Sequence, residues 1–446
     1  MSIRFGFVST RFSGTDGVSL ESFKWAEVLE NAGHTCYWFA GELEREPESS
    51  FLMPEAHFLH PKIEWINQNV MGRPNRKPAI TEMIHELRAK IKANLYQFIH
   101  QFNIDILVVQ NALTIPMNVP LGLALAETIS ESQIPTIAHH HDFAWERDRY
   151  AVNGIGEYIQ MAFPPKLPTV AHVVINSSAR EELAHRSGVS STYIPNMMDF
   201  ENPPLRHKIT NGFRQINGLG PDDIVILQPT RVVQRKGIEH AIEVVKQLKI
   251  ENCKLLVSHE AGDEGFEYHG WLIQRARQEG VDLRFVETDL SGHFDRISGG
   301  DKRFSLWDAY RHADFVTFPS LCEGFGNALL EAVYFQKPVM VNRYSTYIRD
   351  IEPLGFDFVT MDGIVTQSTV ESVREILTDS DRRRKICRHN YQVAAKHFSY
   401  RVLRNRLEEI LSHLTGERIC LDSDNLLPMR NVVHLNPPVR SAALAP

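Results

Sequence analysis

The sequence has 446 residues, of which 43% are hydrophobic and 23% are charged, and its net charge is −7. A chain of this length is too long for one ordinary core, so two domains of roughly 200 residues each are expected. The acidic balance excludes a basic field for nucleic acid and argues against a large cationic membrane surface. No apolar run reaches the roughly 18 residues that a spanning helix needs. The first residues, Met1–Val8, are typical of a strand rather than of a secretory segment.

Cysteine usage indicates the compartment. The five cysteines lie far apart in the sequence and include no CxxC pair. Neither a disulfide framework nor a zinc knuckle is therefore expected, and a reducing, cytoplasmic location fits best.

Short apolar runs alternate with segments of helical periodicity along most of the chain. Helices are expected at residues 20–32, 81–100, 238–248 and 400–414. Near-continuous apolar strands separated by helices are typical of parallel sheets covered on both faces, so an α/β fold of doubly wound domains is predicted. The expected strands are residues 3–9, 104–109, 134–139, 170–175, 224–228, 254–258, 283–287, 314–318 and 338–342.

A break in this pattern divides the chain. Tyr193–Pro204 is rich in Pro and Asn and lacks periodicity, which is typical of a linker between domains. The predicted domains are residues 1–200 and 205–397, and residues 415–446 form an irregular tail. Residues 51–100 form an insertion in the first domain, for which a solvated loop and a lid that contacts an acceptor are both open interpretations.

Ligands of doubly wound domains bind at the carboxyl ends of the strands. The most informative of the loops at these ends follows the expected strand 314–318. Glu323 lies in this loop, and Gly324 and Gly326 let the backbone turn tightly beside a ligand. Asn327 is a good N-cap, which would place Glu331 on the first turns of a helix whose free N–H groups suit phosphate oxygens. The two carboxylates suit the hydroxyls of a sugar and a ribose. The alternative is a glycine-rich connection with two incidental surface glutamates.

A second loop, Gln228–Ile238, lies between a strand and an amphipathic helix. Arg231 and Lys236 place fixed positive charge at the strand end, which suits the diphosphate of a leaving nucleotide. A solvated basic surface is the alternative. The loop after the first strand, with Gly14 and Gly17, could cradle a phosphate or an acceptor, but it lacks the GxGxxG spacing of an NAD site.

Three consecutive histidines, His139 to His141, lie at the end of the third expected strand. Period-two alternation points His139 and His141 to one side and His140 to the other. A metal site would need further ligands that the sequence does not supply. Hydrogen bonding to sugar hydroxyls and histidines satisfied at a strand end remain the two interpretations.

In combination, these segments resemble the retaining glycosyltransferases of family 4, which have the GT-B fold. Glu323–Glu331 matches the family's E-x7-E motif in spacing, and Arg231 and Lys236 fall where the family has its diphosphate-binding pair. Tyr193–Asp199 is similar to the family's interdomain segment IPNGVD, with Met-Met in place of Gly-Val. The resemblance covers about residues 1–414 and keeps the family's order.

The resemblance implies two Rossmann-like domains facing a central crevice, with an N-terminal acceptor-binding domain and a C-terminal domain for the nucleotide-sugar donor. The final helix, 400–414, would cross back onto the first domain. Glu323 would contact the donor sugar, Glu331 the ribose, and Arg231 and Lys236 the diphosphate. The backbone of the same loop would complete the donor site through Gly324, Phe325, Gly326 and Asn327.

His141, or His140 in another register, would match the family's histidine near the donor sugar. Asp142 is the nearest candidate for a supporting acid. The family transfers with retention and without a metal, so we expect neither a metal nor a cofactor. The Asp-x-Asp strings at 379–381 and 422–424 are interpreted as surface.

The expected reaction moves glucose or mannose from a nucleoside-diphosphate sugar to an acceptor. The string from His140 to Arg147 is similar to members that act on small soluble acceptors, such as glycerate-based compatible solutes. Rival interpretations are a sugar phosphorylase, a nucleotide-sugar epimerase, an inactive nucleotide-sugar-binding assembly subunit, and a transferase directed at lipids or polysaccharides. Both glutamates and both basic residues are present, which argues against an inactive subunit. The basic stretch 381–385 is more simply a solvated helix face than a membrane contact.

Overall fold

The computed structural model describes residues 2–14, 16–203, 212–258, 266–286, 288–289 and 304–421. The chain divides into two compact units. The first contains Met1–Ile194 together with the chain from Leu403 onward, and the second contains Pro195–Val402. The boundary at Ile194 lies inside the segment predicted as a linker.

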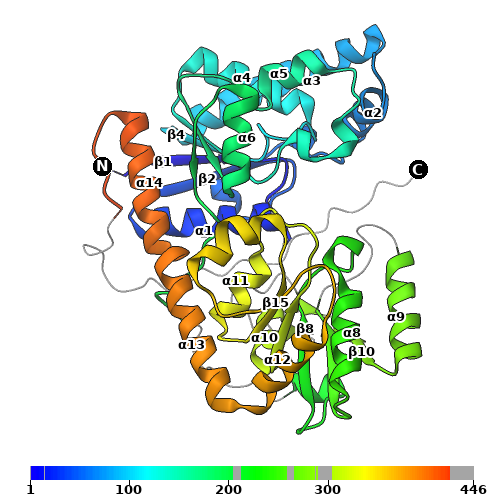
Figure 1. The fold of residues 1–446 in the computed structure, drawn as a ribbon. Helices are drawn as coiled ribbons and strands as arrows, with labels where there is room; N and C mark the ends of the chain where they lie inside the picture. Colours follow the sequence, from blue (N-terminus) through cyan, green and yellow to red (C-terminus); the bar gives the residue numbers. More distant parts are fainter. Residues whose placement is uncertain are drawn as a thin grey trace. The chain divides into compact units, whose positions relative to one another are not determined.

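The first unit contains a seven-stranded parallel sheet with the order β3-β2-β1-β4-β5-β6-β7. Strands β1, β2 and β4 of this sheet are labelled in Figure 1. The strand order reverses between β1 and β4, which makes this pair the topological switch point, where doubly wound sheets bind ligands. The strands are β1 (Arg4–Val8), β2 (Thr35–Ala40), β3 (Ser50–Leu52), β4 (Ile106–Gln110), β5 (Thr136–His140), β6 (Val170–Val174) and β7 (Ser191–Tyr193).

Helices cover this sheet. Side chains of α3 and α4, such as Leu95 and Leu125, form one buried cluster with strand residues Leu107 and Val109. On α1, Trp25 stacks on His139 of β5. The helices of the first unit are α1 (Gly17–Asn31), α2 (Pro61–Val70), α3 (Pro78–Phe102), α4 (Val119–Ser132), α5 (Gly156–Ala162), α6 (Ser177–Ser187) and most of α14 (Tyr400–Thr415).

The insertion 51–100 is not a solvated loop. It begins in edge strand β3 and then forms α2 and α3, whose residues Ile63 and Ile84 are fully buried in a second cluster with α4 and α5. In the mostly exposed stretch 73–78 before α3, Arg76 alone is packed: its Nε donates to Thr81 Oγ1 (2.8 Å) and its guanidinium lies 4.5 Å from the ring centroid of Tyr158.

The second unit contains a six-stranded parallel sheet with the order β10-β9-β8-β13-β14-β15 and a separate parallel pair, β11-β12. Its switch point lies between β8 and β13. The strands are β8 (Ile224–Gln228), β9 (Cys253–Val257), β10 (Asp282–Phe285), β11 (Thr288–Asp289), β12 (Phe304–Ser305), β13 (Phe315–Phe318), β14 (Val339–Asn342) and β15 (Val359–Met361). The helices are α7 (Phe213–Ile216), α8 (Ile238–Leu248), α9 (Glu267–Glu279), α10 (Leu306–His312), α11 (Asn327–Tyr334), α12 (Gln367–Thr378) and α13 (Ser380–His397).

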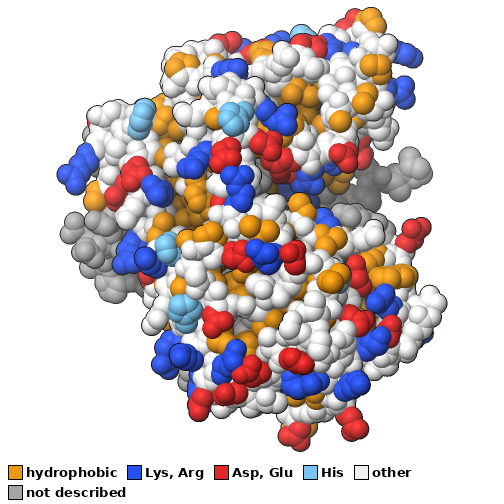
Figure 2. All heavy atoms as spheres, viewed as in Figure 1, with side chains coloured by type: hydrophobic (Ala, Val, Ile, Leu, Met, Phe, Trp, Pro, Cys, Tyr) orange, Lys and Arg blue, Asp and Glu red, His pale blue; other side chains and the backbone are white. Residues whose placement is uncertain are grey.

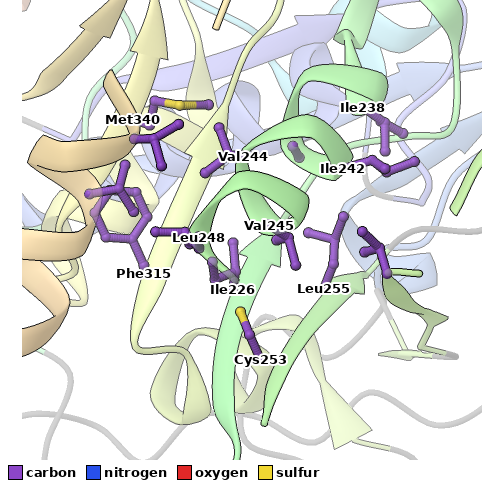
Figure 3. Close-up of a cluster of buried hydrophobic side chains, with 14 of the residues drawn as sticks. Ile226, Ile238, Ile242, Val244, Val245, Leu248, Cys253, Leu255, Phe315 and Met340 are labelled. Atoms are coloured by element: carbon purple, nitrogen blue, oxygen red, sulfur yellow. The ribbon is translucent and has the colours of Figure 1, made fainter. Parts of the chain in front are cut away.

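The core of the second unit follows from the apolar stripe of α8. Ile238, Ile242 and Val245 recur at helical spacing and pack against Ile226 of β8 and Leu255 of β9 (Figure 3). Burying each side chain of this size contributes about 1.5–3 kcal/mol. This packing fixes the start of α8, and with it the loop that connects β8 to the helix.

Acidic and basic side chains are interspersed over the visible face of the molecule (Figure 2). The basic stretch on α13 belongs to this mixed surface, because Arg382 and Arg384 pair with Glu375 and Asp381. Asp379 caps the same helix through the N–H groups of Asp381 and Arg382, so the first Asp-x-Asp string has a local structural role. The second, 422–424, lies outside the described residues. Among the described helices, none is long and apolar enough to cross a membrane.

Candidate active site

Two loops meet at the switch point of the second unit. One follows β8 and carries Lys236, and the other follows β13 and carries Glu323. The ends of the two strands are joined by Thr317, whose hydroxyl donates to Gln228 Oε1 (2.7 Å). Gln228 in turn donates to Thr230 Oγ1 (2.8 Å), so this buried amide fixes the start of the first loop.

Lys236 and Glu323 form an ion pair in which each side chain is only 11% exposed. Arg235 lies on the other side of the carboxylate, with its Nη1 3.6 Å from Glu323 Oε2. Burial lowers the pKa of the Lys236 ammonium, and the nearby carboxylate opposes that shift. The site therefore holds a desolvated cation that is balanced by the Glu323 carboxylate.

Glycines allow the two loops to approach each other. Gly237 has φ +62°, and a Cβ there would lie 2.5 Å from the carbonyl oxygen of Pro319. Gly326 has φ +125°, and its Cβ would lie 2.8 Å from Tyr344 Oη. The Tyr344 hydroxyl donates to the carbonyl of Phe325 (2.6 Å), which fixes the backbone of this loop.

Helix α11 begins at Asn327, as expected, but Asn327 is not its N-cap. Gly326 occupies that position, and Asn327 Oδ1 instead accepts from the side chain of Asn196 (2.6 Å). No hydrogen bond within the described chain uses the backbone N–H groups of Phe325, Gly326 or Asn327. These donors at the positive end of a helix remain available for an anion.

Glu331 lies one turn into α11 and is 6% exposed. Its Oε2 accepts from the hydroxyl of Tyr310 on α10 (2.9 Å). Burial and the adjacent carboxylate together raise the pKa of the Tyr310 phenol, so this group stays a donor. Sequence reasoning found Glu331 but missed Tyr310, because no local pattern links residues on separate helices. Arg231 is exposed in the loop after β8, close enough to Lys236 to lower its pKa.

The three histidines at the end of β5 alternate as expected. His140 is buried, with Thr114 Oγ1 2.6 Å from its Nδ1 and His172 Nδ1 2.9 Å from its Nε2. His139 is 1% exposed; its ring stacks on Trp25 and lies tilted against His141, with 4.3 Å between ring centroids in each pair. His141 is the one of the three with exposed surface.

His141 Nε2 lies 3.0 Å from Gln110 Oε1, at the end of β4. Burial lowers the pKa of His141 to about 4, so the ring is neutral and donates from Nε2 to the amide oxygen. Asp142 is already engaged, because it accepts from Asn111 Nδ2 (3.0 Å) and pairs with Arg147 (Nε to Oδ2, 2.7 Å). These contacts orient the loop after β5.

In the described part of the loop after β1, three N–H groups near the predicted cradle already have acceptors. Asp16 Oδ1 accepts from the N–H groups of Val18 and Ser19 at the start of α1, whose first residue is Gly17. The Gly14 N–H donates to the carboxylate of Glu44 (2.9 Å). Within the described residues, no group of three or more His, Cys, Asp or Glu side chains is arranged to hold a metal ion.

Two doubly wound parallel units are the architecture of the GT-B fold class, and the buried Lys236–Glu323 pair lies at a switch point, where such sheets bind ligands. Residues 210–393 match the family described as glycosyl transferases group 1. The chain is 33% identical over 435 residues to a mannosylglucosylglycerate synthase of Thermotoga maritima, covering 89% of this chain and 96% of the relative. The chain belongs to the group 1 glycosyltransferases.

Further comparisons agree with this assignment. A mannosylglucosylglycerate synthase of Petrotoga mobilis is 32% identical over 384 residues, which cover 80% of this chain and 86% of the relative. Sucrose-phosphate synthase of Thermosynechococcus elongatus has a TM-score of 0.64 at 13% identity, with 93% of this chain and 99% of that chain covered. HepE of Anabaena, solved with UDP and glucose, has a TM-score of 0.62 at 13% identity and coverages of 92% and 100%. The structural neighbours support the fold, and the sequence relatives support a hexosyltransferase.

Proposed function

We propose that this chain is a retaining, metal-independent hexosyltransferase that moves a hexose from a nucleoside-diphosphate sugar to a small glycerate-type acceptor. The observation that carries the proposal is the pairing of Lys236 with Glu323 at the switch point of the second unit. A buried cation paired with a carboxylate suits a ligand with one diphosphate and several hydroxyls.

The donor would bind by exchange of partners. Its diphosphate competes with Glu323 for the Lys236 ammonium, and Arg231 adds a second positive charge. The released Glu323 carboxylate then accepts from hydroxyls of the hexose. Glu331, oriented by Tyr310, accepts from the ribose hydroxyls, and the N–H groups of Phe325, Gly326 and Asn327 donate to the remaining anionic oxygens.

These residues also account for the chemistry. Negative charge grows on the diphosphate as the bond to the hexose breaks, and fixed cations that stabilise it lower the barrier by about 3–4 kcal/mol per strong donor. Because Lys236 and Arg231 supply this charge, the proposal needs no metal. In the first unit, the neutral His141 ring is proposed as a hydrogen-bonding partner of a sugar hydroxyl.

The acceptor class is proposed from two sources. The sequence relatives are named for a product that contains glucosylglycerate joined to mannose. The string from His140 to Arg147, which also resembles members that act on glycerate-based solutes, is consistent with this acceptor class. All five cysteines are free, which supports the proposed cytoplasmic location.

The test is a transfer assay with UDP-, GDP- and ADP-linked glucose and mannose against D-glycerate and glucosylglycerate. We expect one donor–acceptor pair to release nucleotide and form a glycoside with the anomeric configuration of the donor, assigned by proton NMR. Activity should persist after EDTA treatment. An inverted product would contradict retention, and loss of activity that is restored by a divalent cation would contradict metal independence. Conversion of the donor sugar without an acceptor would favour an epimerase.

A further inference from the structure

The first unit has a cavity of about 120 Å³ at its own switch point. The cavity is lined by the residues that follow β1, by the end of β4 and by the start of α1. Its volume is below the roughly 300–1,000 Å³ of pockets that hold a whole drug-sized ligand. It therefore suits one small end of a larger molecule.

Two side chains in the cavity wall, Asp16 and Asn111, have acceptor oxygens that are already used. Asp16 accepts from the N–H groups of Val18 and Ser19 and from the Ser19 hydroxyl, and its Oδ2 also accepts from Arg11 (3.1 Å). Asn111 has both ends engaged, since its Oδ1 accepts from the His141 N–H and its Nδ2 donates to Asp142.

The donors, by contrast, are in excess. Gln110 lines the cavity and is 0% exposed. Its Oε1 accepts from His141, and this contact orients the amide so that Nε2 is left without a hydrogen-bond partner within the described chain. A buried N–H donor without an acceptor lowers the stability of the fold, and a ligand that accepts a hydrogen bond from it would remove this penalty. Arg11 has five N–H groups, of which one bonds to Asp16, and its guanidinium lies 5.4 Å from the ring centroid of Phe58.

The Arg11 charge is balanced by Asp16, so what the cavity offers a ligand is donors, namely the other guanidinium N–H groups of Arg11 and the Gln110 amide, and these suit a carboxylate. We propose that this cavity binds the carboxylate of the acceptor, with Arg11 and Gln110 as the residues that recognise it. This inference rests on the proposed function, because it assigns the acid end of a glycerate-type acceptor to this cavity. Ile115 and Met117 line it as well and limit it to a short, compact group.

The first experiment measures binding rather than turnover. D-glycerate and its uncharged analogue glycerol are titrated into the full-length protein by calorimetry, with wild type, Arg11→Gln and Gln110→Glu compared. We expect glycerate to bind wild type at least about tenfold more tightly than glycerol, as a charge-assisted contact requires. Arg11→Gln should lose most of that preference. Gln110→Glu keeps the oxygen that accepts from His141 but replaces the free donor with a negative oxygen, and it should abolish glycerate binding.

Arg180→Gln is the matched control, because Arg180 is an exposed arginine on α6 of the same unit. Equal glycerate affinity in wild type and Arg11→Gln, or equal binding of glycerol and glycerate, would overturn the proposal. Circular dichroism and the thermal midpoint verify that each variant is folded. Arg11→Lys keeps the positive charge and removes the guanidinium, so its glycerate affinity separates the effect of charge from that of the arginine N–H groups.

Turnover separates this inference from the function on which it rests. With glucosylglycerate as acceptor, Arg11→Gln should raise the acceptor KM about tenfold or more while the donor KM changes little. If no hexose is transferred to any glycerate compound but glycerate still binds through Arg11, the proposed function fails and the anion site stands. If transfer occurs and Arg11→Gln leaves the acceptor KM unchanged, the function stands and the carboxylate site is wrong.

Discussion

Lys236 and Glu323 lie 87 residues apart in the sequence, yet their side chains form a buried ion pair. The pair forms because β8 and β13 are neighbours in the sheet and each strand ends in one of the two loops. Lys236 was predicted to bind the donor's diphosphate and Glu323 its sugar, and in this structure the two side chains neutralise each other. This arrangement has consequences for stability and for binding that can be measured separately.

We expect Lys236→Ala to destabilise the second unit by about 3 kcal/mol, because it leaves the Glu323 carboxylate buried without its ammonium partner. The double variant Lys236→Ala/Glu323→Ala should be less destabilised than the sum of the single variants, because it removes both charges. Urea unfolding of the four proteins in this cycle measures the coupling. Strictly additive changes in the free energy of unfolding would show that the pair contributes nothing.

Substituting Lys236 and substituting Glu323 should change nucleotide affinity in opposite directions. Lys236→Ala is expected to weaken nucleoside-diphosphate binding about tenfold or more, since a charge-assisted contact is lost. Glu323→Ala should bind the free nucleotide at least as tightly as wild type, because the carboxylate that competes for Lys236 is gone, while hexose transfer falls. Lys246→Ala, on the exposed side of α8, is the control. Weaker nucleotide binding in Glu323→Ala would contradict the exchange of partners.

Glu331 gives a prediction about the nucleotide's sugar. If Glu331 accepts from the ribose hydroxyls, wild type should bind the ribonucleotide more tightly than its 2′-deoxy form, and Glu331→Ala should lose this preference. Tyr310→Phe should have a partial effect, because it removes the 2.9 Å hydrogen bond that orients the carboxylate. Calorimetric titration with both nucleotides measures the ratio of affinities. An undiminished ratio in Glu331→Ala would remove the residue from the ribose site.

Stability should depend on pH through the buried histidines. Burial lowers the folded-state pKa of His141 and of His172 to about 4, below the ordinary value near 6.5. Between about pH 6.5 and 4 the unfolded chain therefore binds more protons than the folded one. The stability that depends on keeping these histidines neutral is fully present above pH 6.5 and is lost as the pH falls through this window. Each residue lowers the free energy of unfolding by up to about 1.4 kcal/mol per pH unit.

Urea unfolding at pH 7 and pH 5 tests this dependence. His172→Asn, whose amide oxygen can accept from His140, should lose less stability on acidification than wild type. His185→Asn, at an exposed position on α6, should behave as wild type does. Identical acid sensitivity in His172→Asn and wild type would show that His172 is not responsible.

The sequence predicted the fold well where segments are long and periodic. The nine expected strands are all present within two residues of their bounds, and α8 has the predicted limits. The edge strands β3, β7 and β15 were not predicted, because three residues are too few to show a pattern. Strand β2, Thr35–Ala40, was also overlooked, although five of its six residues are buried or half-buried.

The site was predictable where its residues share a loop and a motif. Glu323 and Glu331 were found in this way, Lys236 was found as a cation in the loop after another strand, and the roles of all three in binding remain predictions. Tyr310 and Gln110 were not found, because each acts on a residue brought near only by the tertiary fold. One local signal was available: β4 and β8 are apolar strands that both end in a fully buried glutamine at a switch point.

Gly326 provides the last prediction, since its backbone shapes the turn at the start of α11, which is proposed to bind the donor's anionic oxygens. At φ +125° a side chain is strained, and a Cβ would lie 2.8 Å from Tyr344 Oη, which is itself held by the Phe325 carbonyl. Gly326→Ala should therefore cost about 1–3 kcal/mol of stability. It should also weaken nucleotide binding, because relief of the contact moves the N–H groups at the start of α11.

Gly270→Ala is the control. Gly270 lies within α9, and a Cβ added there would have nothing within 4 Å, so this substitution should be neutral or stabilising by up to about 1 kcal/mol. Thermal unfolding and nucleotide titration of both variants decide the matter: if Gly326→Ala matches Gly270→Ala in both measurements, this turn does not depend on glycine.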